Sequence, residues 1–328
     1  MTSPWTYHGG RLDAARRHYG GGDADWIDLS TGINPNPWPV ERAGGIDWAS
    51  LPGEGALADL EGAAGRYFGV AADHVCALPG TEIGLRMLAD MLPGAARYAT
   101  PCYRTHGDIY PAGRAIALDE EAGGEGETML LANPNNPDGR LLTPAELNAM
   151  LARVEATGGW LVVDEAFVDI HPGFSLADRI GEGRRLLIFR SFGKFFGLAG
   201  VRLGFLLGPQ EIVARYRVRL GSWPVSAAAL AIGRAAYADA AWIDATRKAL
   251  VAQGAGLDAL LRRHGLEPAG ACPLFRLVAC DDAAALFDRL ARAAILTRPF
   301  ADQPHWLRFG LPADGAALDR LDRALTHG

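Results

Sequence analysis

Residues 186–204 read LLIFRSFGKFFGLAGVRLG, an apolar run followed by a lysine among glycines and aromatic residues. The run 186–190 is typical of a buried strand, and Lys194 comes shortly after its end. In such surroundings a lysine is partly desolvated, which lowers its pKa toward the range where the amine is a nucleophile. A surface lysine in a loop is the alternative. The segment therefore predicts a strand that leads into a reactive lysine.

Short apolar runs of the same kind recur along the chain. They cover residues 74–78, 97–100, 114–118, 128–132, 160–164, 186–190 and 203–207. Helical stretches separate several of them: one at 56–68, one after Gly80 with apolar residues at 83, 87 and 91, and one at 144–157. The last opens with Thr143-Pro144 and has Glu146 at the capping-box position. Strands that alternate with helices predict an α/β fold with a mostly parallel, seven-stranded sheet between helices.

The pattern changes after about residue 212. Long Ala/Leu helices are expected over 226–264, and a final helix over 313–326. Between them we expect strands at 273–279, 295–298 and 306–309 and a helix at 282–293. The first 50 residues are rich in Gly, Pro and Asn and show little periodicity. We therefore expect a large domain at 41–212, and an N-terminal arm (1–40) that joins 213–328 in a smaller α+β domain.

Composition excludes several classes of protein. Of the 328 residues 49% are hydrophobic and 21% charged, which is ordinary for a globular chain. The net charge of −6 and the lack of a basic run argue against nucleic acid as a partner. Four cysteines without CxxC spacing predict neither a zinc site nor a disulfide framework, so we expect no metal. Neither a signal peptide nor a membrane span is evident, so we expect a cytoplasmic protein without a membrane partner.

Three further segments place polar groups beside predicted strands or at a helix start. Asp164 ends the run 160–164, where parallel sheets bind ligands, although a strand-end cap is the plainer interpretation. Residues 133–139, Asn-Pro-Asn-Asn-Pro-Asp-Gly, directly follow the run 128–132 and alone signal a turn. Residues 79–82, Pro-Gly-Thr-Glu, open a helix, whose free N–H groups and dipole could hold a phosphate.

Taken together and in this order, these four segments resemble the fold-type-I family of pyridoxal-phosphate (PLP) enzymes, the aspartate-aminotransferase-like group. The resemblance covers nearly the whole chain. It implies that Lys194 bonds covalently to the cofactor aldehyde and that Asp164 pairs with the pyridine nitrogen. It implies also that Asn136 binds the 3′-oxygen of the ring and that Tyr103 stacks on the ring.

The resemblance also assigns residues to the cofactor phosphate. Gly80, Thr81, Ser191 and Arg202 would hold it, and Glu82 in the same segment is counted among the cofactor-binding residues. There are two departures from the family pattern. Phe167 replaces a tyrosine that many relatives carry after Asp-Glu-Ala, and residues 51–56 lack a Tyr-Pro-Asp-x-x-Tyr segment. In relatives the second tyrosine of that segment reaches the neighbouring subunit, so its loss weakens the homodimer that the family implies.

The N-terminus narrows the resemblance. His8-Gly9-Gly10, followed by Asp-Leu-Ser-Thr-Gly-Ile-Asn-Pro at 28–35, resembles the threonine-phosphate decarboxylases of cobalamin biosynthesis. Residues 164–169 and 296–299 fit the same subgroup. The resemblance implies loss of CO₂ from L-threonine O-3-phosphate, giving (R)-1-amino-2-propanol phosphate. Whether serine phosphate is an equal substrate stays open, because one methyl group is worth only about 1–3 kcal/mol of discrimination.

The same resemblance suggests the substrate-binding residues. Arg308 would grip the α-carboxylate, with bidentate geometry, and Asn136 is included among the substrate-binding residues. We expect His8, backbone groups near Thr31-Gly32, and Arg298 to hold the substrate phosphate, with Arg140 as a further candidate. The alternatives are a histidinol-phosphate-type aminotransferase, which needs the same cofactor residues, and a non-catalytic protein with this fold. Nucleotide binding is disfavoured, because the glycine-rich motifs for it are missing.

Overall fold

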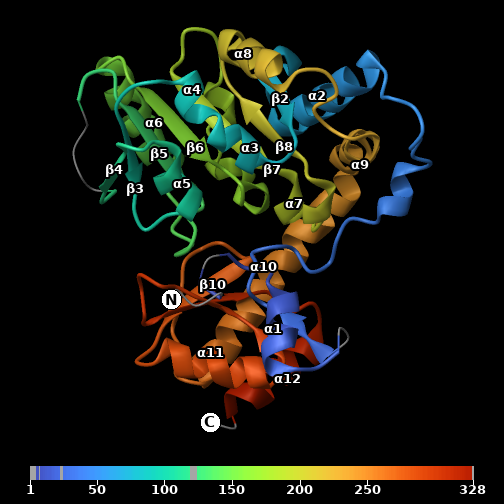
Figure 1. Ribbon diagram of the computed structural model, residues 1–328, viewed down its shortest axis with the longest axis vertical. Helices are drawn as coiled ribbons and strands as arrows, with labels where there is room; N and C mark the ends of the chain where they lie inside the picture. Colours follow the sequence, from blue (N-terminus) through green and yellow to red (C-terminus); the bar gives the residue numbers. More distant parts are fainter. Residues whose placement is uncertain (1–4, 7, 23–24, 119–123, 327–328) are drawn as a thin grey trace. The chain divides into compact units, whose positions relative to one another are not determined.

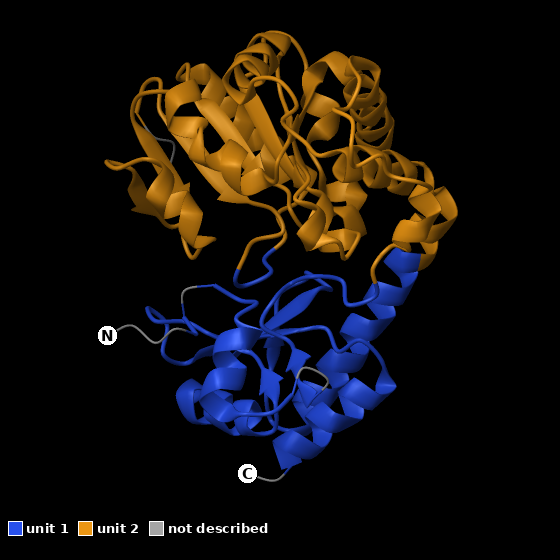
Figure 2. Cartoon of the chain, turned by 45° about the vertical axis from the view of Figure 1, so that its right-hand side comes forward, with its two compact units in different colours: residues 1–36, 137–140, 246–328 blue, residues 37–136, 141–245 orange. Residues whose placement is uncertain are grey.

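The computed structural model describes residues 5–6, 8–22, 25–118 and 124–326. The chain divides into two compact units (Figure 2). The large unit comprises residues 37–136 and 141–245, and the small unit comprises residues 1–36, 137–140 and 246–328. Residues 213–245, which the sequence analysis groups with the small domain, thus cluster with the large unit. The cause is the packing of α9 (Ala227–Ala238) against α2 (Glu54–Phe68).

The large unit contains a seven-stranded sheet (Figure 1). Its strand order is β2-β8-β7-β6-β5-β3-β4, and every neighbouring pair is parallel except β8, which runs antiparallel to β2 and β7. This confirms the predicted fold class. In sheet order the strands are β2 (Val75–Leu78), β8 (Gly204–Leu207), β7 (Leu186–Ser191), β6 (Trp160–Asp164), β5 (Thr128–Ala132), β3 (Ala96–Ala99) and β4 (Arg114–Ile116).

The central strands β5, β6 and β7 are mostly apolar, as is typical of a parallel sheet that helices cover. On one face a core joins buried strand residues such as Val162 and Leu187 to residues of four helices. These helices are α3 (Thr81–Arg86), α4 (Leu88–Met91), α5 (Arg104–Ile109) and α8 (Gln210–Leu220). Two short helices that meet at Met87 are present instead of the single helix expected after Gly80. Ile83, which was expected on the apolar face of that helix, is 44% exposed.

One predicted helix start is seen in full. Helix α6 (Pro144–Ala156) begins after Thr143, whose hydroxyl accepts from the Glu146 N–H while the Glu146 carboxylate accepts from the Thr143 N–H. Short helix α7 (Phe192–Phe195) follows β7 directly and carries Lys194. The lysine thus follows the strand as residues 186–194 predict, and the short helix that carries it is not among the sequence expectations.

The small unit combines a four-stranded antiparallel sheet with helices, as the α+β expectation requires. The sheet order is β12 (Arg298–Pro299), β13 (Trp306–Gly310), β10 (Phe275–Ala279) and β9 (Pro268–Ala269). The short strands β1 (Ile27–Asp28) and β11 (Ile295–Leu296) form a separate parallel pair. The helices are α1 (Leu12–Tyr19), α11 (Ala283–Arg292), α12 (Gly315–Thr326) and part of α10 (Ala240–Arg263).

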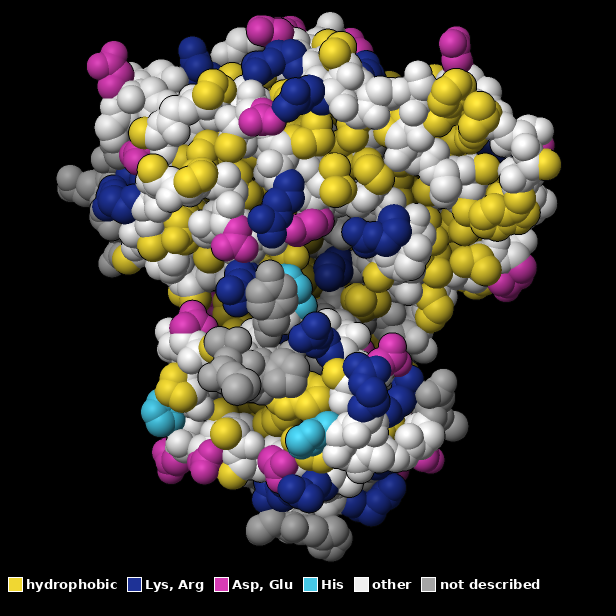
Figure 3. Space-filling model, in the orientation of Figure 1, with side chains coloured by type: hydrophobic (Ala, Val, Ile, Leu, Met, Phe, Trp, Pro, Cys, Tyr) yellow, Lys and Arg dark blue, Asp and Glu magenta, His cyan; other side chains and the backbone are white. Residues whose placement is uncertain are grey.

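Helix α1, eight residues long with Ala15 buried, is absent from the sequence expectations, which treat the first 50 residues as a segment of little periodicity. Basic and acidic side chains are interspersed over the face of the large unit seen in Figure 3. Among the described helices, none combines the length and apolar character that crossing a bilayer requires. The described residues hold no cluster of three or more His, Cys, Asp or Glu side chains suited to a metal ion.

Candidate active site

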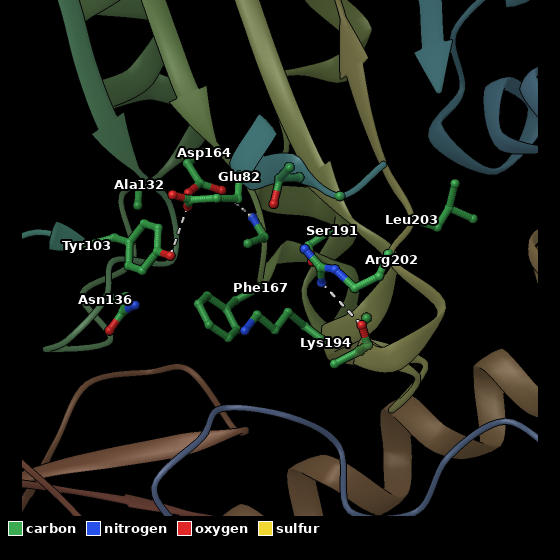
Figure 4. Close-up of a pocket in the computed structure, with 15 residues that line it drawn as sticks. Glu82, Tyr103, Ala132, Asn136, Asp164, Phe167, Ser191, Lys194, Arg202 and Leu203 are labelled. Atoms are coloured by element: carbon green, nitrogen blue, oxygen red, sulfur yellow. Dashed lines mark hydrogen bonds between the residues drawn. The ribbon is translucent and has the colours of Figure 1, made fainter. Parts of the chain in front are cut away.

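A cavity of about 150 Å³ lies in the large unit, beside the carboxyl ends of β5, β6 and β7 (Figure 4). The carboxyl ends of neighbouring parallel strands meet at one edge of a sheet, so residues far apart in the sequence converge there. All nine residues predicted to bind the cofactor line this cavity. They are Gly80, Thr81, Glu82, Tyr103, Asn136, Asp164, Ser191, Lys194 and Arg202.

Asp164 is a buried carboxylate whose two oxygens have different partners. Its Oδ1 accepts from the Ala166 N–H at 3.1 Å, and its Oδ2 lies 3.1 Å from Nε2 of His106. His106 is fully buried on α5. The backbone on one side and the imidazole on the other therefore fix the orientation of the carboxylate. His106 could not be found from the sequence, because its partner is 58 residues away along the chain.

Lys194 enters the cavity from the first turn after β7. Its Nζ lies 5.6 Å from the centre of the Phe167 ring, and Figure 4 shows the two side chains next to each other. Gly193 is needed at this turn, since an added Cβ would come within 2.7 Å of the Ala199 Cα. The lysine is thus an amine beside the Phe167 ring, in the cavity that the buried Asp164 also lines. The predicted lowering of its pKa stays a prediction.

The same cavity is lined by groups of the kind that bind anions. Gly80 has a φ of +88°, and an added Cβ there would lie 2.6 Å from Nη2 of Arg202. Gly204 similarly lets β8 approach the Thr81 N–H, which an added Cβ would meet at 2.7 Å. Together with the Ser191 hydroxyl, the helix start and the guanidinium supply donors of the kind that hold a phosphate.

Tyr103 is held through Glu82. Its hydroxyl donates to Glu82 Oε2 at 3.0 Å, and Thr105 Oγ1 lies 3.0 Å from both oxygens of the same carboxylate. Burial raises the pKa of Tyr103 to about 12, and the charge of Glu82 adds to the rise. The phenol therefore stays protonated at physiological pH. In this structure Glu82 accepts the hydrogen bond that holds Tyr103, the aromatic wall of the cavity. Direct contact between Glu82 and a cofactor stays a prediction.

These groups fit pyridoxal phosphate. The cavity offers an amine for the aldehyde, a buried carboxylate for the pyridine nitrogen, an aromatic wall and a phosphate cradle closed by two glycines that leave no room for a Cβ. No single one of these features is specific, but the full set in one cavity meets each chemical group of that cofactor.

The family model described as aminotransferase class I and II matches residues 94–325. The chain belongs to this family. It is 43% identical to the threonine-phosphate decarboxylase of Pseudomonas aeruginosa, over 97% of this chain and 96% of that protein. It is 40% identical to the threonine-phosphate decarboxylase of a Sinorhizobium species, over 100% and 99% of the two chains. These findings confirm the resemblance stated from the sequence, and with it pyridoxal phosphate as the cofactor.

A solved aminotransferase structure has the same fold as this chain. The histidinol-phosphate aminotransferase from Sinorhizobium meliloti, in complex with pyridoxal-5'-phosphate, matches with a TM-score of 0.81 and 20% identity. The match covers 96% of this chain and 93% of that one. At this identity the likeness concerns the fold alone. The choice between aminotransferase and decarboxylase must therefore come from elsewhere.

Three charged residues to which the sequence analysis assigned no individual role lie beside the carboxyl ends of β6 and β7. Arg190, on β7 next to Ser191, pairs with Asp169 and lies 3.5 Å from Glu165. All three are buried, and the Arg190 guanidinium lies 4.4 Å from the centre of the Phe68 ring. Burial raises the pKa of Glu165, and the Arg190 charge opposes that rise. The cluster ties the ends of β6 and β7 together.

The residues predicted for the substrate fall into both units. Asn136 lines the cavity of the large unit, whereas His8, Thr31, Gly32, Arg298 and Arg308 belong to the small unit. Within the small unit Arg298 and Arg308 are paired across β12 and β13, and both are buried. Burial and, after it, the charge of Arg298 lower the pKa of Arg308 to about 9. Two guanidinium groups on neighbouring strands are suited to an anionic ligand.

Arg140 and His8 are placed by backbone interactions. Arg140 lies in the segment 137–140 of the small unit, where its N–H donates to Asp138 Oδ1 at 3.0 Å. His8 is half-buried and precedes Gly9, which packs against Ser30. Neither observation tests the predicted contact with a phosphate, so both roles stay predictions.

Proposed function

We propose that this chain decarboxylates L-threonine O-3-phosphate to (R)-1-amino-2-propanol phosphate and CO₂, with pyridoxal phosphate as cofactor, in cobalamin biosynthesis. The observation that carries the choice of reaction is the 43% identity to a threonine-phosphate decarboxylase over nearly the full length of both chains. The cavity alone would serve an aminotransferase equally well, since both reactions need the same lysine and carboxylate.

We assign the chemistry in the large unit to Lys194 and Asp164. When bound, pyridoxal phosphate supplies an electron sink for the electron pair released at the substrate Cα. Asp164, buried and oriented by His106, keeps the pyridine nitrogen protonated. Lys194 holds the cofactor before the substrate amine arrives, and then its Nζ donates the proton that replaces the lost carboxylate at Cα.

We assign substrate orientation to the small unit. Arg308 holds the α-carboxylate, and Arg298, His8 and the backbone near Thr31-Gly32 hold the phosphate. When bound, the cofactor would accept the electron pair of the Cα bond that the protein orients for cleavage, so a decarboxylase must orient the bond from Cα to the carboxylate. Binding energy from the remote phosphate fixes that orientation. The two buried arginines support this assignment, because they place two guanidinium groups opposite each other on the neighbouring strands β12 and β13.

We further propose that the protein works as a homodimer and that its partner molecule is a small phosphorylated amino acid. Membership of the aminotransferase class I and II family supports the dimer. The segment 51–56 lacks the tyrosine through which many relatives contact the neighbouring subunit's cofactor. A dimer of this chain therefore has to complete its phosphate site with Gly80, Thr81, Ser191 and Arg202 alone or with another residue.

The experiment uses the holoenzyme and L-threonine phosphate without any keto acid. We expect release of CO₂ and aminopropanol phosphate in equal amounts. Lys194→Ala should bind the cofactor without a covalent bond and lose turnover. No CO₂, together with amino transfer once 2-oxoglutarate is added, would refute the proposal in favour of the aminotransferase.

A further inference from the structure

Ser30 occupies a buried junction in the small unit. It is 2% exposed, and its N–H and hydroxyl both donate to Oδ1 of Asp28, at 2.8 and 2.6 Å. Its carbonyl oxygen accepts from Nη2 of Arg308 at 2.9 Å. Burial raises the pKa of Asp28, and the hydrogen bonds from Ser30 oppose that rise. One serine therefore contacts both a buried carboxylate and a buried guanidinium.

Residues 8–10 of the N-terminal arm reach the same serine from the other side. The Gly10 N–H donates to Ser30 Oγ at 2.7 Å. Gly9 lies so close to the Ser30 carbonyl that an added Cβ would overlap its oxygen. The Ser30 hydroxyl thus accepts from the arm and donates to Asp28 at the same time, which a hydroxyl can do and a methyl group cannot.

The backbone on which Ser30 sits is itself fixed. The Leu29 N–H donates to the Leu296 carbonyl at 2.7 Å, and the Gly310 N–H donates to the Leu29 carbonyl at 2.7 Å. Gly310 ends β13, the strand that carries Arg308, and an added Cβ on it would overlap the Thr31 carbonyl oxygen. Residues 8–10 are therefore attached through Ser30 to a segment whose backbone is held by hydrogen bonds.

We propose that Ser30 is a positioning residue that locks residues 8–10 of the arm, and with them His8, onto the segment that contacts Arg308. This rests on the proposed function, in which His8 and Arg308 bind the two anionic groups of the substrate. A locked arm presents both residues before substrate arrives, so less ordering is needed on binding. The lock therefore determines affinity for the phosphorylated substrate and leaves cofactor chemistry in the large unit unchanged.

Two variants break the lock in different ways, and each has a matched control. Ser30→Ala removes the hydroxyl, and Gly9→Ala forces a methyl group against the Ser30 carbonyl. Ser226→Ala also removes a hydroxyl that accepts from a backbone N–H, but at the start of α9. Gly45→Ala adds a methyl group where no described atom lies within 4 Å and φ is not positive.

Steady-state kinetics and limited proteolysis of the holoenzyme form the test. For Ser30→Ala and Gly9→Ala we expect KM for L-threonine phosphate to rise about 5- to 10-fold, the effect of one hydrogen bond, with kcat within about twofold of the wild type. In both variants trypsin should cut after Arg11, an exposed residue directly after residues 8–10, several times faster than in the controls.

The outcomes separate this inference from the proposed function. Faster cleavage with a raised KM supports the lock. Cleavage no faster than in the controls overturns it, whatever the kinetics show, and faster cleavage with an unchanged KM overturns its role in substrate binding. If the wild type releases no CO₂ from L-threonine phosphate, the proposed function fails, and the cleavage rates still decide whether Ser30 locks the arm.

Discussion

Gly80→Ala tests the phosphate cradle most directly. Gly80 has φ +88° and ψ +149°, a backbone conformation that residues with a Cβ rarely adopt. Alanine there costs about 1–3 kcal/mol of folding free energy. In addition the new Cβ would lie 2.6 Å from Nη2 of Arg202, about 1 Å inside normal contact, so the guanidinium must move.

The expected loss of cofactor affinity follows from that displacement. A hydrogen bond to a charged group contributes about 1.5–3 kcal/mol, so losing the one from Arg202 to the cofactor phosphate should weaken binding by about 10- to 150-fold. Titration of the apoprotein with pyridoxal phosphate, followed by absorbance, measures the affinity. Gly200→Ala is the control, because Gly200 lies two residues before Arg202 and its added Cβ would meet no described atom within 4 Å. Affinity of Gly80→Ala within threefold of the control would refute the reasoning.

Three further predictions concern Asp164, Asp28 and Thr143. Asp164→Asn should keep cofactor binding but lose at least about 100-fold in kcat, because a neutral amide cannot keep the pyridine nitrogen protonated; unchanged turnover in a decarboxylation assay would contradict this. Burial raises the pKa of Asp28 above its ordinary 3.8, so the folded state keeps this proton to higher pH than the unfolded state. The stabilisation that this proton provides is present below pH 3.8 and is lost as the pH rises through the raised pKa. The free energy of unfolding in urea should therefore fall over that pH range in the wild type relative to Asp28→Asn. Thr143→Ala should lower the free energy of unfolding by about 0.5–2 kcal/mol through loss of the capping box, with KM unchanged in the same assay.

The sequence predicts the cofactor cavity well because its residues sit at strand ends. Asp164 and Lys194 each come at or just after an apolar run of a parallel sheet, and such positions converge whatever the loops between them do. The seven expected strands are all present, and the central strands β5, β6 and β7 are buried along nearly their whole length.

Residues that act on other residues could not be predicted this way. His106 lies on a six-residue helix, and only the folded sheet brings it to Asp164. Ser30 is part of a stretch that looks like an extended, turn-rich segment, and its importance lies in backbone hydrogen bonds that leave no mark on composition. The break at Met87 depends on local backbone geometry, to which a spacing of four residues is blind.

The distribution of residues between the units leads to a separation of effects. The nine residues around the cavity belong to the large unit, and the buried Arg298–Arg308 pair belongs to the small unit. Substitutions in the first set should therefore change cofactor affinity or kcat, and those in the second should change KM for the phosphorylated substrate. Since an aminotransferase would need the same first set, we propose that the reaction is chosen by how the second set holds the carboxylate. On this proposal, substitutions of Arg298 and Arg308 should change substrate binding and leave cofactor affinity unchanged.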